Sequence, residues 1–534
     1  MTAVLERPAT RHSAPPRPVR ARAVFAAAAA LYLALGTVLV FGFDSIMEDA
    51  LSRVSAASSV WSAVDPKLAA VGFVWTPLPA LLMVPFTVLR PLWPALVSTG
   101  FAAVVISALS MAGAVAAVHG ILADLRVRGT ARWLVTALFA LQPLILVYAT
   151  NGMTEALLML CLLVSARRLL RWLRAGEGTG RRAHDLVVAG IALGVGYLAR
   201  YEAIVAAAAV TLLVVAVTWW RTRDRNAVLV DALLAGLPAA AAFVIWALLS
   251  WLTVGSPFEQ FTSAYGNAAL TGASRSGSLG DVAAQVLLLA PLALPLLVAA
   301  CWRRPLAALA PVAVFGSVLV FEWLLRAAGD LFGFLRYQIM VIPLLAVVLA
   351  LLLAEARPRR GLRTAGAALL AIVAFGGAAV TSGLLVLNGT TLASQEYLRI
   401  RPVVDSVLDR PTIAGANGMW AGDRALAARI DALDLPPGSV LADSGSAFAV
   451  LAASAHPQAF LITSDTGFDA ALADPPAHGI RYVLRNEQGG IDAVRTTWPN
   501  LASTGWAQEI ASIPAATPWS YSWTLWQVTP QTGR

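Results

Sequence analysis

The chain has 534 residues, of which 58% are hydrophobic and only 13% are charged, and its formal net charge is +9. A soluble protein would carry about 25% charged residues, so the composition excludes a soluble enzyme. The arginines cluster in short segments between apolar runs, which indicates signals for membrane topology and not a nucleic-acid-binding surface.

The N-terminal segment 1–22 is rich in proline and arginine, so we expect a disordered cytoplasmic tail. Eleven apolar runs follow it, and each is expected to form a membrane-spanning helix because backbone polar groups must pair internally in lipid. They lie near 23–43, 97–121, 131–149, 154–166, 185–199, 203–219, 228–251, 282–301, 307–325, 334–354 and 364–387. This threading puts 23 arginines on the cytoplasmic side and 6 basic residues on the other, as the positive-inside rule predicts.

Two predicted outer segments within this part are too long to be simple connections. The first, 44–96, holds a polar, helix-compatible stretch and then an aromatic, proline-rich run from Phe73 to Pro79. The second, 253–281, is rich in glycine, serine and asparagine.

The composition changes after the last span. Mixed polar sequence alternates with short apolar runs at 440–442, 460–463 and 481–484. This alternation predicts a small extracytoplasmic α/β domain at 391–534, which follows an all-α polytopic membrane domain at 23–390.

An acidic cluster directly follows the first span and consists of Asp44, Glu48 and Asp49. A carboxylate at a membrane mouth is a suitable general base for a sugar or lipid hydroxyl if it lies within hydrogen-bond distance. Asp65, beside Lys67 in the same loop, is a further candidate. The structural alternative is a solvated helix start, with Asp49 paired to Arg53 at i,i+4.

Further polar residues lie at the outer ends of later spans, namely Glu155, Arg200, Tyr201, Glu202, Arg336 and Tyr337. Ionisable groups at such depths are costly and usually face a cavity or a partner. Because a guanidinium donates two parallel hydrogen bonds to a phosphate, Arg200 and Arg336 are candidates for phosphate binding. Helix capping by Glu155 and snorkelling of the arginines stay open as structural alternatives.

Several common kinds of site are missing from the sequence. The chain has no Walker-type loop, no dinucleotide-binding glycine motif and no histidine pair at metal-ligand spacing. Its two cysteines, Cys161 and Cys301, lie in or at the end of apolar runs and offer neither a disulfide framework nor a thiolate metal site. We therefore expect no direct use of a nucleotide, and an enzyme on the outer face would need a donor carried by lipid.

Together these features resemble the GT-C superfamily of integral-membrane glycosyltransferases, and most of all its protein O-mannosyltransferase and aminoarabinose-transferase branch of the actinobacterial type. The resemblance covers 23–390 in architecture and rests on several short motifs. They are Glu48-Asp49-Ala50-Leu51-Ser52-Arg53, the run from Asp65 to Pro79, Met153-Thr154-Glu155, Ala199-Arg200-Tyr201-Glu202, the run from Gly255 to Phe261, and Leu335-Arg336-Tyr337 with Pro343. One departure is that the acidic doublet is Glu-Asp and not two aspartates, which leaves the base open between Asp49 and Asp44.

The resemblance implies a polyprenyl-phosphate sugar as donor and an extracytoplasmic glycan, lipid or protein of the cell envelope as acceptor. Asp49 would deprotonate the acceptor hydroxyl, which attacks the anomeric carbon with inversion, and Asp44 and Glu48 complete the predicted catalytic group. Predicted donor-phosphate ligands are Arg336, Tyr337 and Arg200, and predicted acceptor or substrate ligands are Asp65, Glu155, Tyr201 and Glu202. Some relatives need a divalent metal, and the lack of histidine in the outer acidic cluster favours a metal-independent reaction.

Two other functions would also use many spans and cavity arginines. A transporter or flippase for lipid-linked saccharides should have inverted repeats and helices broken at the midplane, and the sequence gives clear signs of neither. A non-catalytic partner in envelope assembly predicts that Asp49 is dispensable. In each case the expected location is a bacterial plasma membrane, with the N-terminus in the cytoplasm and the C-terminal domain outside.

Overall fold

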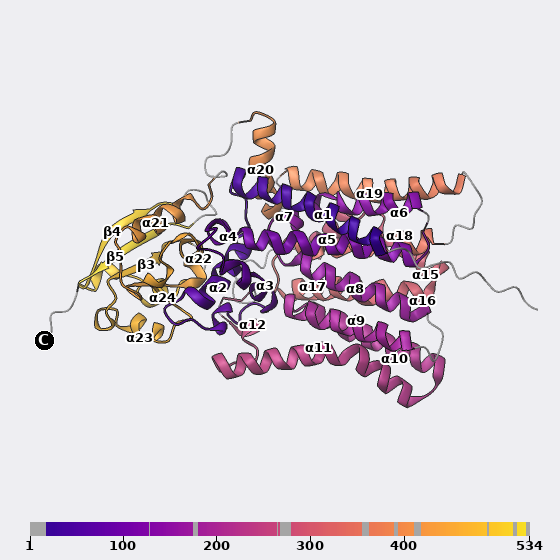
Figure 1. Ribbon diagram of the computed structural model, residues 1–534, viewed down its shortest axis with the longest axis horizontal. Helices are drawn as coiled ribbons and strands as arrows, with labels where there is room; N and C mark the ends of the chain where they lie inside the picture. Colours follow the sequence, from indigo (N-terminus) through magenta and orange to yellow (C-terminus); the bar gives the residue numbers. More distant parts are fainter. Residues whose placement is uncertain are drawn as a thin grey trace, which may run out of the picture.

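The computed structural model describes residues 18–127, 129–174, 180–263, 265–266, 279–354, 362–388, 394–410, 418–488, 491–515 and 521–529. It contains a bundle of long helices that run side by side and a smaller α/β domain at one end of the bundle (Figure 1). Most of the predicted tail, residues 1–17, lies outside the described residues. The prediction of disorder is wrong for its last five residues, because helix α1 already begins at Pro18.

The bundle consists of sixteen helical segments among the described residues. They are α1 (Pro18–Thr37), η1 (Val38–Gly42), α5 (Phe101–Asp124), α6 (Gly129–Ala140), α7 (Pro143–Thr150), α8 (Glu155–Arg174), α9 (Gly180–Ala199), α10 (Ala203–Thr222), α11 (Arg225–Val254), α14 (Leu279–Leu289), α15 (Ala293–Arg303), α16 (Pro305–Pro311), η3 (Val312–Gly316), α17 (Ser317–Ala328), α18 (Val341–Leu353) and α19 (Leu362–Asn388). The all-α polytopic prediction is confirmed.

Eight of the described helical stretches are long and apolar enough to cross a membrane, or ten if each of two bent pairs is one span. The bent pairs are α6 with α7, at 57°, and α14 with α15, at 75°. The predicted span that this count leaves out is the fourth, 154–166, which corresponds to α8 and runs in the bundle beside α5 and α9 (Figure 1). Its second half carries Arg167, Arg168, Arg171 and Arg174, so α8 is less apolar than the others.

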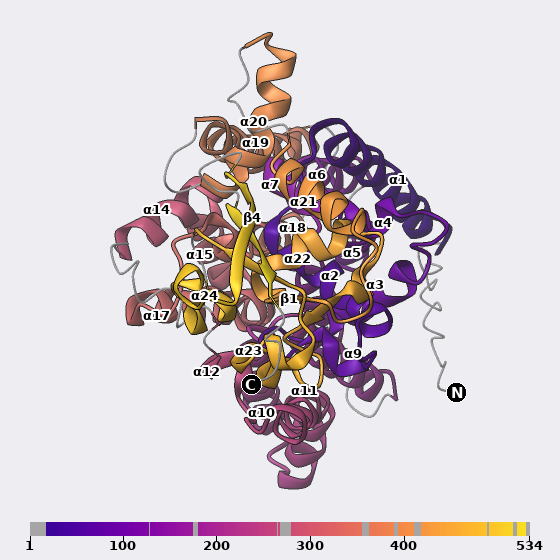
Figure 2. The ribbon, with the colours of Figure 1, turned by 90° about the vertical axis from the view of Figure 1, so that its left-hand side faces the viewer.

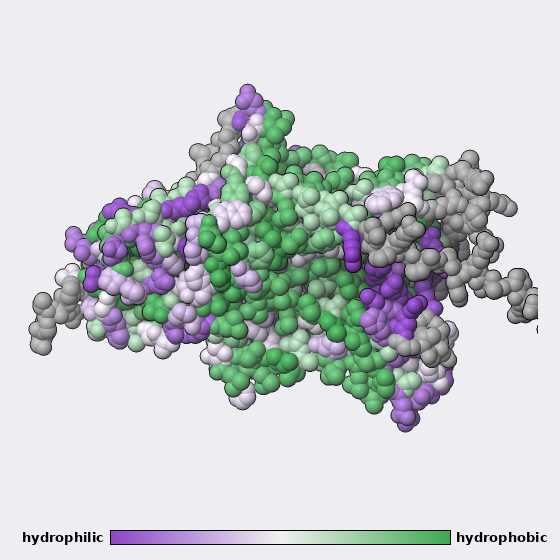
Figure 3. Space-filling view, viewed as in Figure 1, coloured by the Kyte–Doolittle hydropathy of each residue, from purple (hydrophilic) through white to green (hydrophobic). Residues whose placement is uncertain are grey.

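The surface of the bundle is apolar in the middle and polar at both ends (Figure 3). At the end far from the α/β domain, arginines pair with aspartates, as in Arg167–Asp124 at 2.6 Å and Arg182–Asp231 at 2.8 Å. Within the bundle, α18 is apolar on all sides, and its span is 94% buried, as expected for a central helix. The short helix η4 (Leu335–Gln338) leads into α18 and places Arg336 at the N-terminal end of this central helix.

The first outer segment folds as α2 (Glu48–Ser62), η2 (Leu68–Val71), α3 (Leu78–Thr87) and α4 (Ala95–Ser98), and the second contains α12 (Glu259–Thr262). Helix α2 lies between the bundle and the C-terminal domain, where it contacts both α3 and α22 (Figure 1). The aromatic run packs back onto the bundle, because Phe73 stacks on Trp246 of α11 with ring centroids 4.8 Å apart.

The C-terminal part begins with α20 (Ser394–Val407) and α21 (Ala421–Asp431) and continues into a five-stranded sheet. The strands β1 (Val440–Ala442), β2 (Phe460–Ile462), β3 (Tyr482–Asn486), β4 (Ala507–Ile513) and β5 (Trp523–Val528) have the spatial order β2-β1-β3-β5-β4. The first three pair in parallel, and β5 pairs antiparallel to both β3 and β4. The connections hold α22 (Ser444–Ala453), η6 (Pro457–Ala459), α23 (Phe468–Ala473), η7 (Pro476–His478), α24 (Ala493–Thr497) and η8 (Leu501–Ser503), so the predicted α/β domain is confirmed.

Candidate active site

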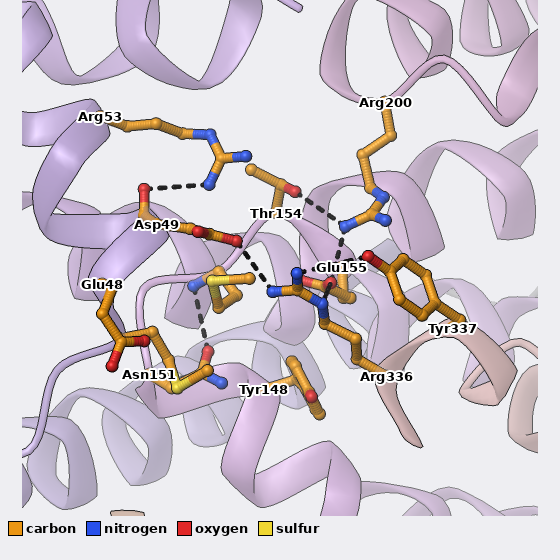
Figure 4. Close-up of polar contacts among 12 residues, drawn as sticks. Glu48, Asp49, Arg53, Tyr148, Asn151, Thr154, Glu155, Arg200, Arg336 and Tyr337 are labelled. Carbon is orange, nitrogen blue, oxygen red and sulfur yellow. Dashed lines mark hydrogen bonds and ion pairs between the residues drawn. The ribbon is translucent and has the colours of Figure 1, made fainter. Parts of the chain in front are cut away.

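Four chain segments meet where the bundle faces α2. They are the N-terminus of α2, the turn between α7 and α8, the turn between α9 and α10, and η4 (Figure 4). Each segment contributes charged side chains from a turn or a helix start, where the backbone can leave the regular direction of the spans. The predicted residues Asp49, Glu155, Arg200 and Arg336 therefore form one cluster, although up to 287 residues separate them in the chain.

Asp49 and Arg336 form the central contact of this cluster. The Nη1 of Arg336 donates to Oδ2 of Asp49 at 2.9 Å, and the side chains are 7% and 28% exposed, respectively. Arg53 lies one turn further along α2 and donates to the main-chain oxygen of Asp49 at 3.0 Å. Burial raises the pKa of Asp49, but the positive charges of Arg336, Arg53 and Arg200 outweigh it and hold this pKa below its ordinary value.

Arg200 is held between two carboxylates. Its Nη1 contacts Glu155 at 2.6 Å, and its Nη2 and Nε contact Oε1 of Glu202 at 2.6 and 3.1 Å. The Nε of Arg336 lies 3.9 Å from the same oxygen of Glu155, so Glu155 lies between the two arginines. This network fixes the guanidinium planes of both arginines with acids that are themselves almost fully buried.

The cluster surrounds a pocket with an aromatic rim. Its lining includes Asp49, Arg53, Arg200, Arg336, Trp75 and the rings of Tyr201 and Tyr337. The guanidinium of Arg53 lies 4.8 Å from the ring centre of Trp75, and that of Arg336 lies 5.2 Å from the ring of Tyr337. Aromatic faces hold these cations in place without neutralising them. Arg53 contacts the main-chain oxygen of Asp49, so its guanidinium can still pair with an anion.

Many buried polar atoms at this site lack a hydrogen-bond partner among the described residues. They are Arg53 Nε, Asn151 Nδ2, Glu155 Oε2, Glu202 Oε2, Arg336 Nε and Gln338 Oε1. Buried polar groups are normally satisfied, and a group of unsatisfied ones needs an explanation such as water or a ligand. Arg53, Glu202 and Arg336 among them line the pocket, which indicates a place that binds a polar molecule.

Three predicted site residues lie away from this pocket. Asp44 makes two contacts with Arg424 of α21, at 2.9 and 2.7 Å, and Glu48 pairs with Arg399 of α20 at 2.6 Å. The side chain of Glu48 points away from the Asp49–Arg336 contact (Figure 4). Asp65 pairs with Lys67 at 3.0 Å and also accepts a hydrogen bond from Thr466 of the C-terminal domain.

The structure also brings in residues that the sequence analysis did not select as site residues. The sequence pattern indicates Arg53 only as an i,i+4 partner of Asp49, and it gives no signal for Arg399 or Arg424. Tyr148 of α7 donates to the buried carboxylate of Glu396 in α20. The i,i+4 spacing from Asp49 is a sequence signal for Arg53. No local sequence pattern marks Arg399, Arg424 or Glu396 as site residues.

A metal requirement was left open by the sequence. Among the described residues, no three histidine, cysteine, aspartate or glutamate side chains gather at metal-binding distance. At the pocket, arginine already contacts Asp49, Glu155 and Glu202. The side chains at the pocket therefore offer an anion-binding set of guanidiniums.

A long helical bundle that carries a polar pocket under an outer α/β domain defines a GT-C-type membrane fold. Residues 91–246 match the family model described as dolichyl-phosphate-mannose-protein mannosyltransferase. The matched segment runs through the membrane bundle from before α4 into α11, and it agrees with the resemblance of the sequence to GT-C membrane glycosyltransferases. No curated protein matches the sequence.

Two solved structures have the same fold. The structure of ArnT from Cupriavidus metallidurans bound to undecaprenyl phosphate superposes with a TM-score of 0.57 at 17% identity, over 95% of this chain and 98% of that chain. The structure of the same protein in the apo state gives a TM-score of 0.53 at 16% identity, with the same coverage. At such identities the likeness concerns the fold.

Proposed function

We propose that this protein transfers a sugar from a polyprenyl-phosphate donor to a hydroxyl group of an extracytoplasmic acceptor, with inversion at the anomeric carbon. The observation that carries the proposal is the Asp49–Arg336 contact of 2.9 Å in a pocket with three arginines. It joins a general base to a phosphate-binding cation, and these are the two groups that the reaction needs. The binding of undecaprenyl phosphate by ArnT, which shares the fold, supports the choice of donor.

In this reaction Asp49 accepts the proton of the acceptor hydroxyl. The hydroxyl oxygen attacks the anomeric carbon, and the bond from that carbon to the phosphate oxygen breaks. The electron pair of the broken bond leaves with the lipid phosphate, whose charge grows from one to two. Arg336 and Arg200 face this growing charge, and the aromatic ring of Tyr337 holds Arg336 at the pocket.

The contact between Asp49 and Arg336 also suggests an order of events. Without donor, the guanidinium of Arg336 stabilises the ionised carboxylate and makes it a weak base. A donor phosphate that binds Arg336 adds negative charge beside Asp49 and raises the affinity of this carboxylate for a proton. The donor thereby activates the base, so that proton transfer follows donor binding.

The remaining predicted roles follow from position. Glu155 and Glu202 hold Arg200, while Tyr201 lines the pocket and can contact the acceptor or the sugar. Asp44, Glu48 and Asp65 act at the contact with the C-terminal part and not on the reacting atoms. The arginine-rich end of the bundle would face the cytoplasm of a bacterium, and the C-terminal domain would face the cell envelope.

The test uses purified full-length protein in nanodiscs, a panel of radiolabelled polyprenyl-phosphate sugars and an envelope extract as acceptor. We expect transfer from one donor, a fall of about 10²–10⁴-fold in Asp49→Asn, and much smaller effects in the control variants Asp44→Asn and Asp65→Asn. NMR of the product should show the inverted anomeric configuration. Full activity of Asp49→Asn, or no transfer from any donor by folded protein, would reject the proposal in favour of transport or assembly.

A further inference from the structure

Helix α20 leaves the bundle sideways. It runs across the direction of the spans at their outer ends, and its far half projects beyond the perimeter of the bundle in two views (Figures 1 and 2). The near half is anchored beside the candidate active site, since Glu396 accepts a hydrogen bond from Tyr148, and Arg399 pairs with Glu48 at the contact with the C-terminal part. The far half therefore lies where the outer leaflet of a membrane has its headgroups.

A groove separates this far half from the outer end of α19. It encloses a cavity of about 240 Å³ with an apolar lining from Leu387 of α19 and Tyr397, Ile400 and Val404 of α20. Pockets for drug-sized molecules have volumes of about 300–1,000 Å³. The groove therefore has room for a headgroup with part of a chain, and not for an entire lipid-linked sugar.

The polar lining of the groove is mainly basic. Arg401, Asp405 and Arg410 contribute to it, so two guanidiniums face one carboxylate. Arg401 already pairs with Asp405 at 3.0 Å. Arg410 is exposed, and its guanidinium has no ion-pair partner within the described part of the chain. An arginine fork of this kind suits a phosphate.

The groove opens onto an apolar surface. On α19, Val380, Leu384 and Leu387 are 61%, 54% and 49% exposed, and at the tip of α20 Val407 is 76% exposed. The apolar side of the projecting helix faces the apolar band of the bundle, and its tip is polar (Figure 3). A helix with this pattern lies in the plane of a membrane interface, with its apolar side toward the acyl chains.

We propose that the groove between α19 and α20 binds the phosphate of an anionic phospholipid from the outer leaflet. Arg410, with Arg401, would contact the phosphate, and an acyl chain would lie along the exposed side chains of α19. The lipid would fix the far half of α20, whose near half holds Glu48 through Arg399. Lipid binding here is independent of sugar transfer and can be measured without a donor.

The test uses full-length protein from phosphatidylglycerol or phosphatidylcholine nanodiscs, transferred to detergent for native mass spectrometry. Wild type should retain phosphatidylglycerol in preference to phosphatidylcholine. The double variant Arg401→Gln/Arg410→Gln should bind phosphatidylglycerol about 30-fold more weakly, since each arginine near a membrane surface contributes measurably to anionic-lipid binding. Arg481→Gln, which removes an exposed arginine of the C-terminal domain, should bind as wild type does.

Three outcomes would overturn the proposal. In the first, the double variant retains as much phosphatidylglycerol as wild type does. In the second, wild type retains the two phospholipids equally. In the third, protein from native membranes shows polyprenyl phosphate as the lipid that the double variant loses. If the double variant does not fold, Arg410→Gln alone serves as the variant, because this side chain is exposed and makes no ion pair with the described residues. Thermal unfolding checks the fold of each variant.

Discussion

The acidic cluster after the first span contains two kinds of carboxylate. Asp49 faces Arg336 of the membrane bundle, whereas Asp44 and Glu48 face Arg424 and Arg399 of the C-terminal part. Helix α2 begins at Glu48, and neighbouring side chains on a helix point about 100° apart. Asp44 precedes the helix in a left-handed backbone conformation, with φ at 51°, which turns the chain again. Closeness in sequence therefore does not give these acids a common role.

The two groups also differ in their electrostatic surroundings. Three arginines act on Asp49 and lower its pKa, and the carboxylate still reaches an open pocket. Asp44 pairs with Arg424, whose side chain is 36% exposed, so solvent screens the ion pair, and it also accepts a hydrogen bond from the main-chain N–H of Trp420. We expect variants on the Asp49 side to affect catalysis and variants on the Asp44 side to affect the fit between the two parts of the chain.

After Asp49 itself, the largest effect should come from Arg336. Arg336→Gln removes the cation that faces the leaving phosphate, and loss of one such group costs about 10²–10³-fold in turnover. Arg336→Lys keeps the charge but loses the planar fork, so we expect a partial recovery. Turnover with saturating donor in nanodiscs measures both.

Arg225→Gln provides the matched control, because Arg225 is an exposed arginine at the start of α11. Its activity should equal that of wild type. An Arg336→Gln variant that is folded and fully active would remove the distinction between the two groups of acids.

Much of the fold is predictable from the sequence, because it depends on local patterns. Apolar runs locate the spans, and the runs at 440–442, 460–463 and 481–484 correspond closely to β1, β2 and β3. The last five residues of the predicted tail are a local error, since α1 begins at Pro18 in a segment that contains Arg20 and Arg22. Arginine has a high helix propensity, and a prediction of disorder from composition does not take this propensity into account.

The candidate site is predictable only in part. Residues in the outer turns, such as Glu155 and Arg336, stand out because charge is costly at that depth. The partners of Asp44 and Glu48 do not stand out, because Arg424 and Arg399 belong to a polar region where an arginine is ordinary. Only the tertiary contact across 380 and 351 residues gives them a role.

A second prediction concerns Asp423, a buried acid on the C-terminal side, whose pKa is raised whereas that of Asp49 is lowered. Burial raises the pKa of Asp423 from its ordinary value of 3.8 to about 6. At a pH between these two pKa values, Asp423 keeps its proton in the folded protein but loses it in the unfolded chain. The free energy of unfolding therefore falls as pH rises from about 4 to about 6. When pH is lowered from 7 to 5, we expect the free energy of unfolding to rise by about 1 kcal/mol, since a shift of one pKa unit corresponds to about 1.4 kcal/mol.

Hydrogen exchange of peptides from α21 and β5 in the full-length protein measures this gain. Asp423→Asn cannot titrate, so at each pH it serves as the reference for wild type. Asp443 and Asp465 also have raised pKa values because of burial, but they are the same in both proteins and cancel. An identical pH dependence in wild type and Asp423→Asn would contradict the prediction.

The smallest effect should come from the pair that joins Asp44 to Arg424. Its bonds of 2.9 and 2.7 Å are bidentate, but exposed ion pairs contribute only about 0–1 kcal/mol. Arg424→Gln should therefore lower turnover less than about tenfold, and a double-mutant cycle with Asp44→Asn should give a coupling energy below about 1 kcal/mol. If Arg424→Gln lowers turnover as strongly as Arg336→Gln does, Asp44 shares the chemistry of Asp49, and the C-terminal domain takes part in forming the active site.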